Sequence, residues 1–571
     1  MRKLSLVVLV LLLTFIFSNI SGIVYAQTPP PGQTGGGMDK YESDILKQRA
    51  LTKQITTKRP KPEDSAIEEK ALPTEEGKKL LISNIEVRGV TLLPKQTVDK
   101  ITSPYIGKEL NLGEMQKICD LITAEYRNKG QVTSRAYLPP QSIKDGILVI
   151  MIVEGRLGTV KVEGNRFFSA AQIKKKVRLK AGDFFDYKDL QKSLIKINEH
   201  PDRFVKSVLV PGKEPGTTDI VLEVEDRLPI HVGYEFDNYG SRYINYDRNT
   251  ITAEDNNVFG LDDKFIFRYQ KGQNQFYEMT TVNYTIPLIE SLEAGIYWLW
   301  STVRLGKEYK ALHTKGKSEI GGAFINFPII DMDDVDLRIN CGFDYKHINN
   351  YVNEIKRTRD EARIVKVGFD LDMTDKWGRT VITLEENVGI CAGNLHKKDP
   401  AATNVGAGSE FGKLVGNIYR LQPMPFSSSI LWRSSFQATN YNMLAVEQFQ
   451  IGGISNVRAY APAEYSGDSG LSTTVEWSFP PYGFPKDLKV PFSKATFYDA
   501  TRIAAFYDMG YVHIRNHVTP EKKNTTLQGW GLGFRFNLPE DFFIRLDVAY
   551  RVDRKATFDS CNGYMDVGKK F

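Results

Sequence analysis

Two oppositely charged residues in the C-terminal half lie among apolar residues and glycines. Arg458 lies in the run 457–460 (VRAY) of a glycine-rich segment, and Asp508 lies in the run 506–510 (FYDMG). An aspartate kept from bulk water needs a cation, because an unpaired buried charge is costly. An arginine can give such a carboxylate two parallel charge-assisted hydrogen bonds. A lone arginine in a loop is normally solvated, so the ion pair is expected only if the loop folds back onto the strand of Asp508.

Other chemistry has little support in the sequence. It contains no G-x-S-x-G, H-E-x-x-H or G-x-x-x-x-G-K-[ST] pattern. His513 and His517 are four residues apart, as metal ligands on a helix would be, but they follow the Asp508 strand beside a loop, where exposed histidines are favoured. The net charge of +6 comes from nearly balanced acids and bases, so no nucleic-acid partner is implied. We expect no enzyme activity, no metal and no cofactor.

The strands that must position Asp508 follow a period of two from about Leu228 to Phe571. In the stretch 542–553 one face is apolar and the other is mostly charged. The same parity around Tyr507 places Asp508 on the polar face. About 340 residues divided by roughly 20 per strand and turn predict about 16 strands. A soluble sandwich also alternates, but the length of the pattern favours a transmembrane antiparallel β-barrel with a polar lumen.

One predicted barrel strand carries a row of glycines on its polar face. Gly529, Gly531 and Gly533 alternate with apolar residues. Glycines there leave space for something packed against the wall, although a weak or bent strand explains them equally well.

The N-terminal segment is typical of a secretory signal. Arg2 and Lys3 precede the apolar run 4–17, and Val24 and Ala26 are small residues at the positions that a signal peptidase reads. We expect residues 1–26 to be removed, with Gln27 as the first mature residue, rather than to remain as an anchor helix. A signal followed by a barrel indicates a Gram-negative-type outer membrane.

A linker region, residues 27–80, separates the signal from the first domain. Its Pro/Gly-rich and charged stretches flank a polar helix predicted over Asp39–Lys58. Such a helix has no core of its own. On its residues alone it is equally a disordered tail or a segment that docks elsewhere, for example inside a polar pore.

Two units with the same order of elements follow, at 81–155 and 156–227. Each is predicted as β-α-α-β-β, with a glycine closing the first strand. Asn111 and Glu114 are spaced as a capping box before the apolar stripe of one helix. The stripes are interpreted as the cores of two small α+β domains, and residues 228–571 as the barrel.

These features together resemble the Omp85 superfamily. VRAY is similar to the VRG(Y/F) signature at the tip of its sixth extracellular loop, with Ala459 in place of glycine, and FYDMG is similar to its F-x-D-x-G strand motif. The two small domains resemble its periplasmic POTRA modules. The resemblance implies an arginine–aspartate pair inside the barrel, and the residues that it marks are Val457, Arg458, Ala459, Tyr460, Phe506, Asp508 and Gly510.

The number of POTRA units selects a branch of the superfamily. Two units after an isolated helix resemble the two-partner secretion transporters of the ShlB/FhaC/HecB type, whereas barrel-assembly insertases usually carry more. The resemblance implies that the N-terminal helix plugs the pore at rest. It also implies that the partner is an unfolded secreted exoprotein. A segment of this exoprotein would pair, as an additional strand, with an edge strand of a POTRA sheet. Candidate edge residues are Arg135, Ala136, Tyr137, Leu138, Ser207, Val208 and Leu209.

Further expectations concern the cell envelope. The resemblance implies contacts with outer-membrane lipid, periplasmic chaperones and the barrel-assembly machinery, and we expect a monomer. The terminal Phe571 resembles the C-terminal aromatic signal that this machinery reads. An outer-membrane insertase is the alternative function, and a passive porin would leave the N-terminal half unexplained.

Overall fold

The structure is a computed structural model. It describes residues 35–57, 79–143, 145–289, 292–332, 334–392, 395–516, 522–539, 541–553 and 560–571. The predicted signal peptide, residues 1–26, lies outside these residues, as does most of the predicted linker. The chain divides into two compact units, one holding the barrel with the N-terminal helix and the other holding the two small domains.

The small domains repeat one architecture. In the first, α3 (Lys95–Thr102) and α4 (Leu112–Asn128) accompany a three-stranded sheet of order β2-β5-β4, with strands at Asn84–Arg88, Ile147–Val153 and Arg135–Tyr137. In the second, α5 (Ala170–Lys175) and α6 (Tyr187–Asn198) accompany a sheet of order β6-β8-β7, with strands at Arg156–Glu163, Thr217–Asp226 and Arg203–Pro211. Each central strand pairs with one parallel and one antiparallel neighbour.

Helix α4 shows why the sequence folds this way. Asn111 caps it through the Glu114 amide, and the Glu114 carboxylate accepts from the Asn111 amide, both at 2.8 Å, which is the predicted capping box. Its apolar stripe, with Ile118 and Ile122 fully buried, packs in the core with the sheet residues Leu148 and Ile150. The first domain also has a short β1–β3 pair (Leu80–Ile82 with Lys108–Leu110) that the predicted order did not contain.

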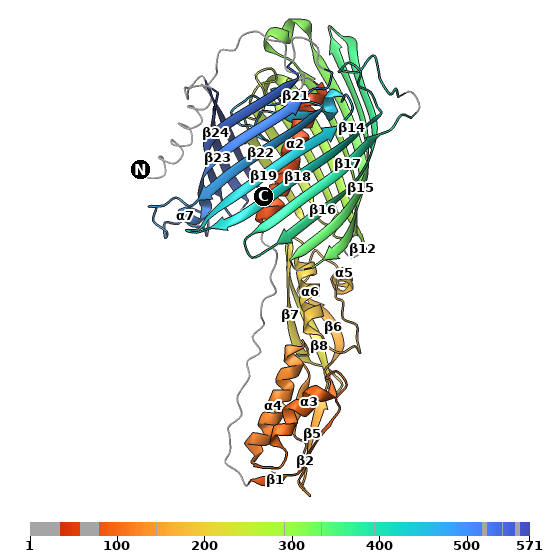
Figure 1. Ribbon diagram of the computed structural model, residues 1–571, viewed down its shortest axis with the longest axis vertical. Coiled ribbons are helices and arrows are strands. Elements are labelled where there is room, and N and C mark those ends of the chain that lie inside the picture. The colour runs from red at the N-terminus through yellow and green to blue at the C-terminus, as the bar shows by residue number, and fades with distance from the viewer. Residues whose placement is uncertain are drawn as a thin grey trace. The chain divides into compact units, whose positions relative to one another are not determined.

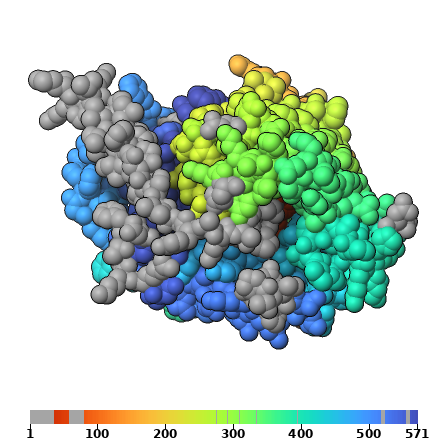
Figure 2. All heavy atoms as spheres, turned by 90° about the horizontal axis from the view of Figure 1, so that it is seen from above, coloured from red at the N-terminus to blue at the C-terminus, as the bar shows by residue number. Residues whose placement is uncertain are grey.

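Sixteen strands close into an antiparallel barrel, as predicted. Seen from above, the chain colours run around the wall in sequence order (Figure 2). The first and last strands, β9 and β26, complete the closure through the pairs from Asp566↔Asp237 to Lys570↔Gly233. The strands are β9 (Ile230–Asp237), β10 (Arg248–Asp255), β11 (Lys264–Gly272), β12 (Tyr277–Ile289), β13 (Leu292–Arg304), β14 (Lys315–Asp331), β15 (Val335–Val352), β16 (Ile355–Thr374), β17 (Arg379–Gly389), β18 (Phe411–Met424), β19 (Ser428–Thr439), β22 (Ser469–Phe479), β23 (Thr501–His513), β24 (Asn524–Asn537), β25 (Phe542–Arg551) and β26 (Cys561–Lys570).

Alternation along β23 separates the two faces of the wall. Phe506 and Asp508 are 5% and 0% exposed, whereas Tyr507 between them is 42% exposed on the outer face. The same period continues along neighbouring strands, so an apolar outer surface surrounds a charged interior.

A helix, α2 (Gly35–Thr56), lies inside the barrel (Figure 1). The predicted start at Asp39 was four residues late, because the glycines of a region predicted to be flexible form the first turn of this helix. Gly35 lies so close to Gly316 of β14 that a Cβ atom on Gly316 would overlap it. The predicted last residue, Lys58, lies outside the described residues. Among the helices that the structure describes, none is long and apolar enough to cross a membrane.

Candidate functional site

The connection between β19 and β22 carries Arg458 into the barrel. Its base is a small hairpin of β20 (Phe449–Ile451) and β21 (Tyr465–Gly467). At the tip, the Asn456 side chain accepts from the Gly452 and Val457 amides, both at 2.7 Å, and donates to the Gln450 carbonyl at 2.9 Å. Gly452 has a φ of 109°, which only glycine adopts readily. These contacts fix the backbone on both sides of Arg458.

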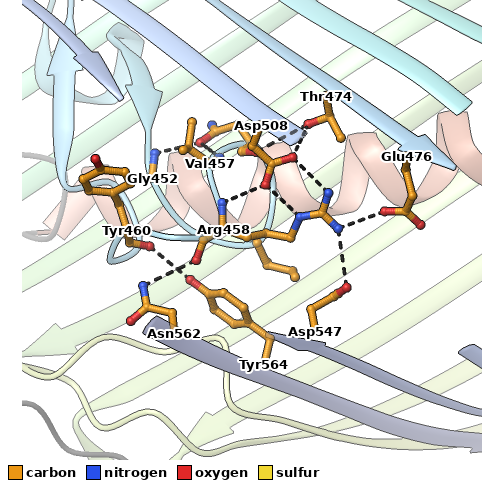
Figure 3. A network of polar contacts seen from close by, with 12 residues as sticks. Gly452, Val457, Arg458, Tyr460, Thr474, Glu476, Asp508, Asp547, Asn562 and Tyr564 are labelled. Carbon is orange, nitrogen blue, oxygen red and sulfur yellow. Dashed lines mark hydrogen bonds and ion pairs between the residues drawn. The ribbon is translucent and has the colours of Figure 1, made fainter. Parts of the chain in front are cut away.

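Arg458 and Asp508 lie in direct contact, and neither is exposed (Figure 3). The Arg458 Nε and Nη2 atoms donate to the two carboxylate oxygens of Asp508, each at 2.9 Å. The Arg458 amide donates to the same carboxylate at 3.1 Å, and the Thr474 hydroxyl does so at 3.0 Å. Asp508 therefore holds both the side chain and the backbone of the loop tip.

Two further carboxylates surround the guanidinium, and they were not among the candidates read from the sequence. The Arg458 Nη1 atom lies 2.8 Å from Glu476 of β22 and 3.4 Å from Asp547 of β25. Arg535 and Arg545 also bind Asp547, at 2.7 and 2.8 Å. The inward parity of Glu476 and Asp547 was visible in the sequence, but their meeting depends on the register of strands far apart in the chain. We call Arg458, Thr474, Glu476, Asp508 and Asp547 the loop–wall cluster.

The residues beside Arg458 pack against glycines of the wall. Val457 lies over Gly510 of β23, where an added Cβ would come within 2.8 Å of its side chain, and Ala459 lies over Gly529 of β24 at 2.6 Å. Of the three glycines on β24, Gly529 leaves room for the loop, whereas a Cβ at Gly531 or Gly533 would meet residues of the wall itself, Phe506 and Val548 or Arg535 and Asp547. Ala459 is not among the residues with positive φ, so alanine fits this backbone without left-handed strain.

Aromatic side chains complete the contacts around the loop tip. The Arg458 guanidinium carbon lies 3.2 Å from the centre of the Phe506 ring. Tyr460 donates to Asp553 at 3.1 Å, and its carbonyl accepts from the Tyr564 hydroxyl of β26, also at 3.1 Å. The loop therefore contacts strands from β22 to β26 rather than one strand alone.

Helix α2 is held to the wall by buried ion pairs. Glu42 is 1% exposed and lies 2.7 Å from Arg248 of β10 and 3.3 Å from Arg268 of β11. Arg248 also lies 2.6 Å from Asp237 of β9. Because these charges are away from solvent, removal of one partner would leave others unpaired.

The C-terminal half of α2 contacts the place where the wall closes. The Arg49 guanidinium lies 2.6 Å from Glu235 of β9 and 2.8 Å from Asp566 of β26. One side chain of the helix thus bridges the first and last strands. Further along, Gln54 donates to Asp372 of β16 at 2.9 Å.

The helix and the loop also contact each other. The Ile454 amide donates to the Tyr41 hydroxyl at 3.1 Å, and the Gln450 side chain donates to the Gly37 carbonyl at 2.9 Å. Met38, Tyr41 and Ile454 share one apolar cluster with residues of the wall. Two segments of the chain therefore occupy the lumen as a connected pair.

The candidate POTRA residues lie on strands at sheet edges. Arg135, Ala136 and Tyr137 form β4, which pairs with β5, and Leu138 follows it. Ser207, Val208 and Leu209 lie in β7, which pairs with β8. In the order of each sheet, β4 and β7 are terminal strands.

Phe571 follows the closing strand. Its amide donates to the Val232 carbonyl of β9 at 2.8 Å, and its ring is 71% exposed. The last residue is thus tied to the first strand, with its aromatic group directed outward.

The structure describes one of the two histidines that the sequence placed four residues apart. His513 is hydrogen-bonded to Asn524 at 2.7 Å, and His517 lies outside the described residues. Within the described ranges, no group of three or more His, Cys, Asp or Glu side chains is arranged to hold a metal ion.

The fold defines the chain as a transmembrane β-barrel protein whose lumen holds a helix and a loop of its own chain. Its structure matches CdiB from Escherichia coli with a TM-score of 0.67 and 18% identity, over 96% of this chain and 100% of that one. It also matches BamA from Haemophilus ducreyi lacking POTRA domains 1–3, with a TM-score of 0.54 and 12% identity, over 86% of this chain and 100% of that one. These likenesses show the fold.

Family comparisons give the more specific assignment. Residues 216–536 match the family described as haemolysin secretion/activation protein ShlB/FhaC/HecB, and residues 80–155 match the ShlB-type POTRA domain. The chain belongs to the ShlB/FhaC/HecB family of two-partner secretion transporters. It is therefore an outer-membrane transporter whose POTRA domains lie in the periplasm.

Named relatives agree over most of the chain. The heme/hemopexin transporter protein HuxB of Haemophilus influenzae (strain 86-028NP) is 22% identical over 79% of this chain and 80% of its own. The outer membrane transporter CdiB of Escherichia coli O6:K15:H31 is 24% identical over 73% of this chain and 71% of its own. Transporters of this family work with a secreted exoprotein.

Proposed function

We propose that this transporter captures its unfolded exoprotein at the POTRA edges and passes it through a lumen that its own chain occupies at rest. In this proposal α2 is the plug and the loop–wall cluster holds the loop against the wall. The observation that carries it is that α2 and the loop fill the barrel together and bind each other through Tyr41 and Gln450.

The type of contact supports a removable plug. Helix α2 is held by several charged contacts, including Glu42 with Arg248 and Arg49 with Glu235 and Asp566. Its apolar contacts are separate clusters, with Met38, Tyr41 and Ile45 in one and Leu51 and Ile55 against Val381 and Tyr419 in another. Once the helix leaves, water can solvate the charged groups of the helix and of the wall. Release from a continuous apolar interface would instead expose apolar surface to water, which is unfavourable.

The capture step uses backbone groups rather than particular side chains. A strand added to β4 or β7 would form main-chain hydrogen bonds with little demand on the sequence of the exoprotein. This suits a partner that arrives unfolded. Delivery by periplasmic chaperones, insertion by the barrel-assembly machinery and a monomeric state complete the proposal.

Tethering the plug tests the proposal. Gln54 and Asp372 are in contact, so cysteines at both positions can be joined by a short bis-methanethiosulfonate cross-linker in a variant whose four native cysteines are serine. We expect cross-linking to stop secretion of the exoprotein and a reductant, which removes the cross-linker, to restore it. Gln54→Cys alone should secrete under both conditions. Undiminished secretion by the fully cross-linked protein would contradict the plug.

The alternative function, an outer-membrane insertase, predicts that deletion of the protein affects different proteins. If the protein assembles other barrels, its deletion should lower the amounts of several outer-membrane proteins while the exoprotein is still exported. We expect the reverse result, which quantitative proteomics of isolated outer membranes and culture medium can measure.

A further inference from the structure

The connection between β22 and β23 is long for a turn at its end of the barrel. β22 ends at Phe479 and β23 begins at Thr501, whereas β14 ends at Asp331 and β15 begins at Val335. In an antiparallel barrel β23, the thirteenth strand counted from β9, starts at the same end as β9. The chain enters β9 from the POTRA domains, so this connection, which includes α7 (Phe497–Ala500), lies at the periplasmic end.

The connection begins on the membrane-facing side of the wall. Trp477 and Phe479 have the outward parity of β22, and Trp477 is 49% exposed. Their ring centres are 5.2 Å apart, and the Tyr482 ring stacks on Phe479 at 6.1 Å with an angle of 2° between the planes. Figure 1 shows α7 beside the lower edge of the wall, outside the outline of the strands. The aromatic row of the outer surface thus continues into the connection.

Tyr482 joins this connection to the neighbouring turn between β18 and β19. Its hydroxyl donates to the Phe426 carbonyl at 2.6 Å. Between the two segments lies an open groove of about 270 Å³. It is lined by Phe426, Ser427, Tyr482, Gly483, Phe484, Lys486 and Tyr498.

Two phenylalanines are presented outward on left-handed backbone. Phe426 has a φ of 61° and is 84% exposed, and Phe492 has a φ of 65° and is 97% exposed. Asparagine or glycine usually occupies such positions, and a bulky residue there is strained. Exposed aromatic rings at these positions are expected where an apolar phase covers them.

One cation lines the groove. Lys486 is exposed, and its amino group lies 5.5 Å from the centre of the Tyr498 ring, so the charge is at the edge of an aromatic surface. Lys489 and Lys494 are exposed on the same connection but do not line the groove. A lysine beside aromatic rings at the boundary of the hydrocarbon layer matches a phosphate group above the first methylenes of a lipid chain.

We propose that this groove binds one anionic phospholipid of the periplasmic leaflet, with its phosphate at Lys486 and its acyl chain over Phe426 and Phe484. The groove is continuous with the outer face that the membrane covers, through Phe479 and Tyr482. The exoprotein instead passes through the lumen on the other side of the wall. A phospholipid is therefore favoured over a polypeptide as the occupant.

Native mass spectrometry of the full-length protein in detergent micelles tests the site. With added phosphatidylglycerol we expect a retained lipid adduct, and Lys486→Gln should reduce it about fivefold, the effect of one lysine near an anionic surface. Lys489→Gln, on the same connection, should retain the wild-type amount. Equal retention by both variants would overturn the proposal.

Further measurements separate the lipid from other ligands of similar chemistry. Phe484→Ala should weaken retention of phosphatidylglycerol and of phosphatidylcholine, because it removes the apolar wall. Displacement of phosphatidylglycerol by millimolar inorganic phosphate would overturn the lipid assignment in favour of a phosphate site. A photo-crosslinker at position 484 should capture phospholipid in cells, and capture of the exoprotein instead would overturn it as well. Heat-modifiable mobility in gels shows that each variant still forms the barrel.

Discussion

Arg458 is the central residue of the loop–wall cluster. It is fully buried and is surrounded by three carboxylates and the Phe506 ring. Removing one partner from such a group leaves charges unpaired, at a cost of about 3–5 kcal/mol. The substitution should destabilise the inward position of the loop rather than the barrel, because the strands keep their backbone pairing.

Arg458→Ala and Asp508→Ala should therefore impair secretion while the barrel still inserts. Exoprotein in the medium and heat-modifiable transporter in the outer membrane measure the two effects. Arg458→Lys keeps the charge but loses the two-pronged contact with Asp508, so we expect it to be impaired as well. Thr474→Val keeps every charge of the cluster and removes only the hydroxyl contacts with Asp508 and the Asn456 carbonyl, so it should be close to wild type. Normal export by both alanine variants would contradict the role of the cluster.

Among the individual residues of the loop–wall cluster, the sequence predicted Arg458 and Asp508 and missed Glu476 and Asp547. The period of two on β23 predicts that Asp508 points inward, and the VRAY run suggests its partner. Glu476 and Asp547 could not be selected, because every charged residue of inward parity was equally eligible. Their choice depends on how far each strand is shifted against the next, which no local pattern encodes.

Helix α2 is the element proposed to plug the lumen. Deletion of residues 35–57 should raise the conductance of single channels in planar bilayers, since the space that the helix fills becomes water. A variant with Glu42→Gln and Arg49→Gln should show frequent openings of similar size, because it keeps the helix but loses its ion pairs with Arg248, Glu235 and Asp566. Conductance identical to wild type in the deletion would show that α2 does not limit the flow of ions.

The edge strand β7 can be tested with proline. Successive amides of an edge strand point alternately toward the sheet and toward solvent. Proline lacks the amide proton, so a substitution at position 207 or 208 removes one of these amides. At one position the lost amide is directed to solvent, and at the other it is hydrogen-bonded to β8. We expect the outward substitution to weaken exoprotein binding and leave the domain folded, as measured by cross-linking yield and circular dichroism. Unchanged binding by a folded outward variant would exclude β7 as the capture edge.

The contacts of Glu154 predict that the first POTRA domain loses stability in acid. Partial burial opposes its charge, but hydrogen bonds from Thr91, Tyr126 and the Leu92 amide keep its pKa below the ordinary value of 4.5. A carboxylate with a lowered pKa stabilises the fold above its ordinary pKa, and this stability is lost as the pH falls through the lowered value. Glu154→Gln should thus destabilise fragment 79–227 toward urea at pH 7, with the difference from wild type shrinking below pH 4.5.

The order of the helices and strands was predicted better than the residues at which they begin and end. The order of helices and strands in the small domains followed from apolar periodicity and the Asn111 cap. The first turn of α2 did not, because glycines are poor helix formers on their own. Gly35 lies against Gly316, and a contact with a residue 281 positions away cannot be read from a local pattern.

For the whole molecule, closure of the barrel brings the last residue next to the first strand. Phe571→Ala removes an exposed ring and keeps the amide that binds Val232, so the finished barrel should be as stable as wild type. The proposed assembly signal predicts lower amounts in the outer membrane, because the exposed ring would be read during assembly rather than packed afterwards. Immunoblots of membrane fractions measure the amount, and Phe571→Tyr should restore it. Wild-type amounts of Phe571→Ala would contradict this role.

The contacts of Arg49 also constrain the order in which the helix and the strands assemble. Arg49 is among the first residues that the structure describes, yet it binds Asp566, which lies 517 positions later. Asp566 reaches its place only when the final strand has paired with β9. The helix therefore cannot complete its contacts before every strand is in place. Under the proposed plug role, the contact of Arg49 with Asp566 is completed only at the end of barrel closure, so full sealing of the lumen belongs to the last stage of biogenesis.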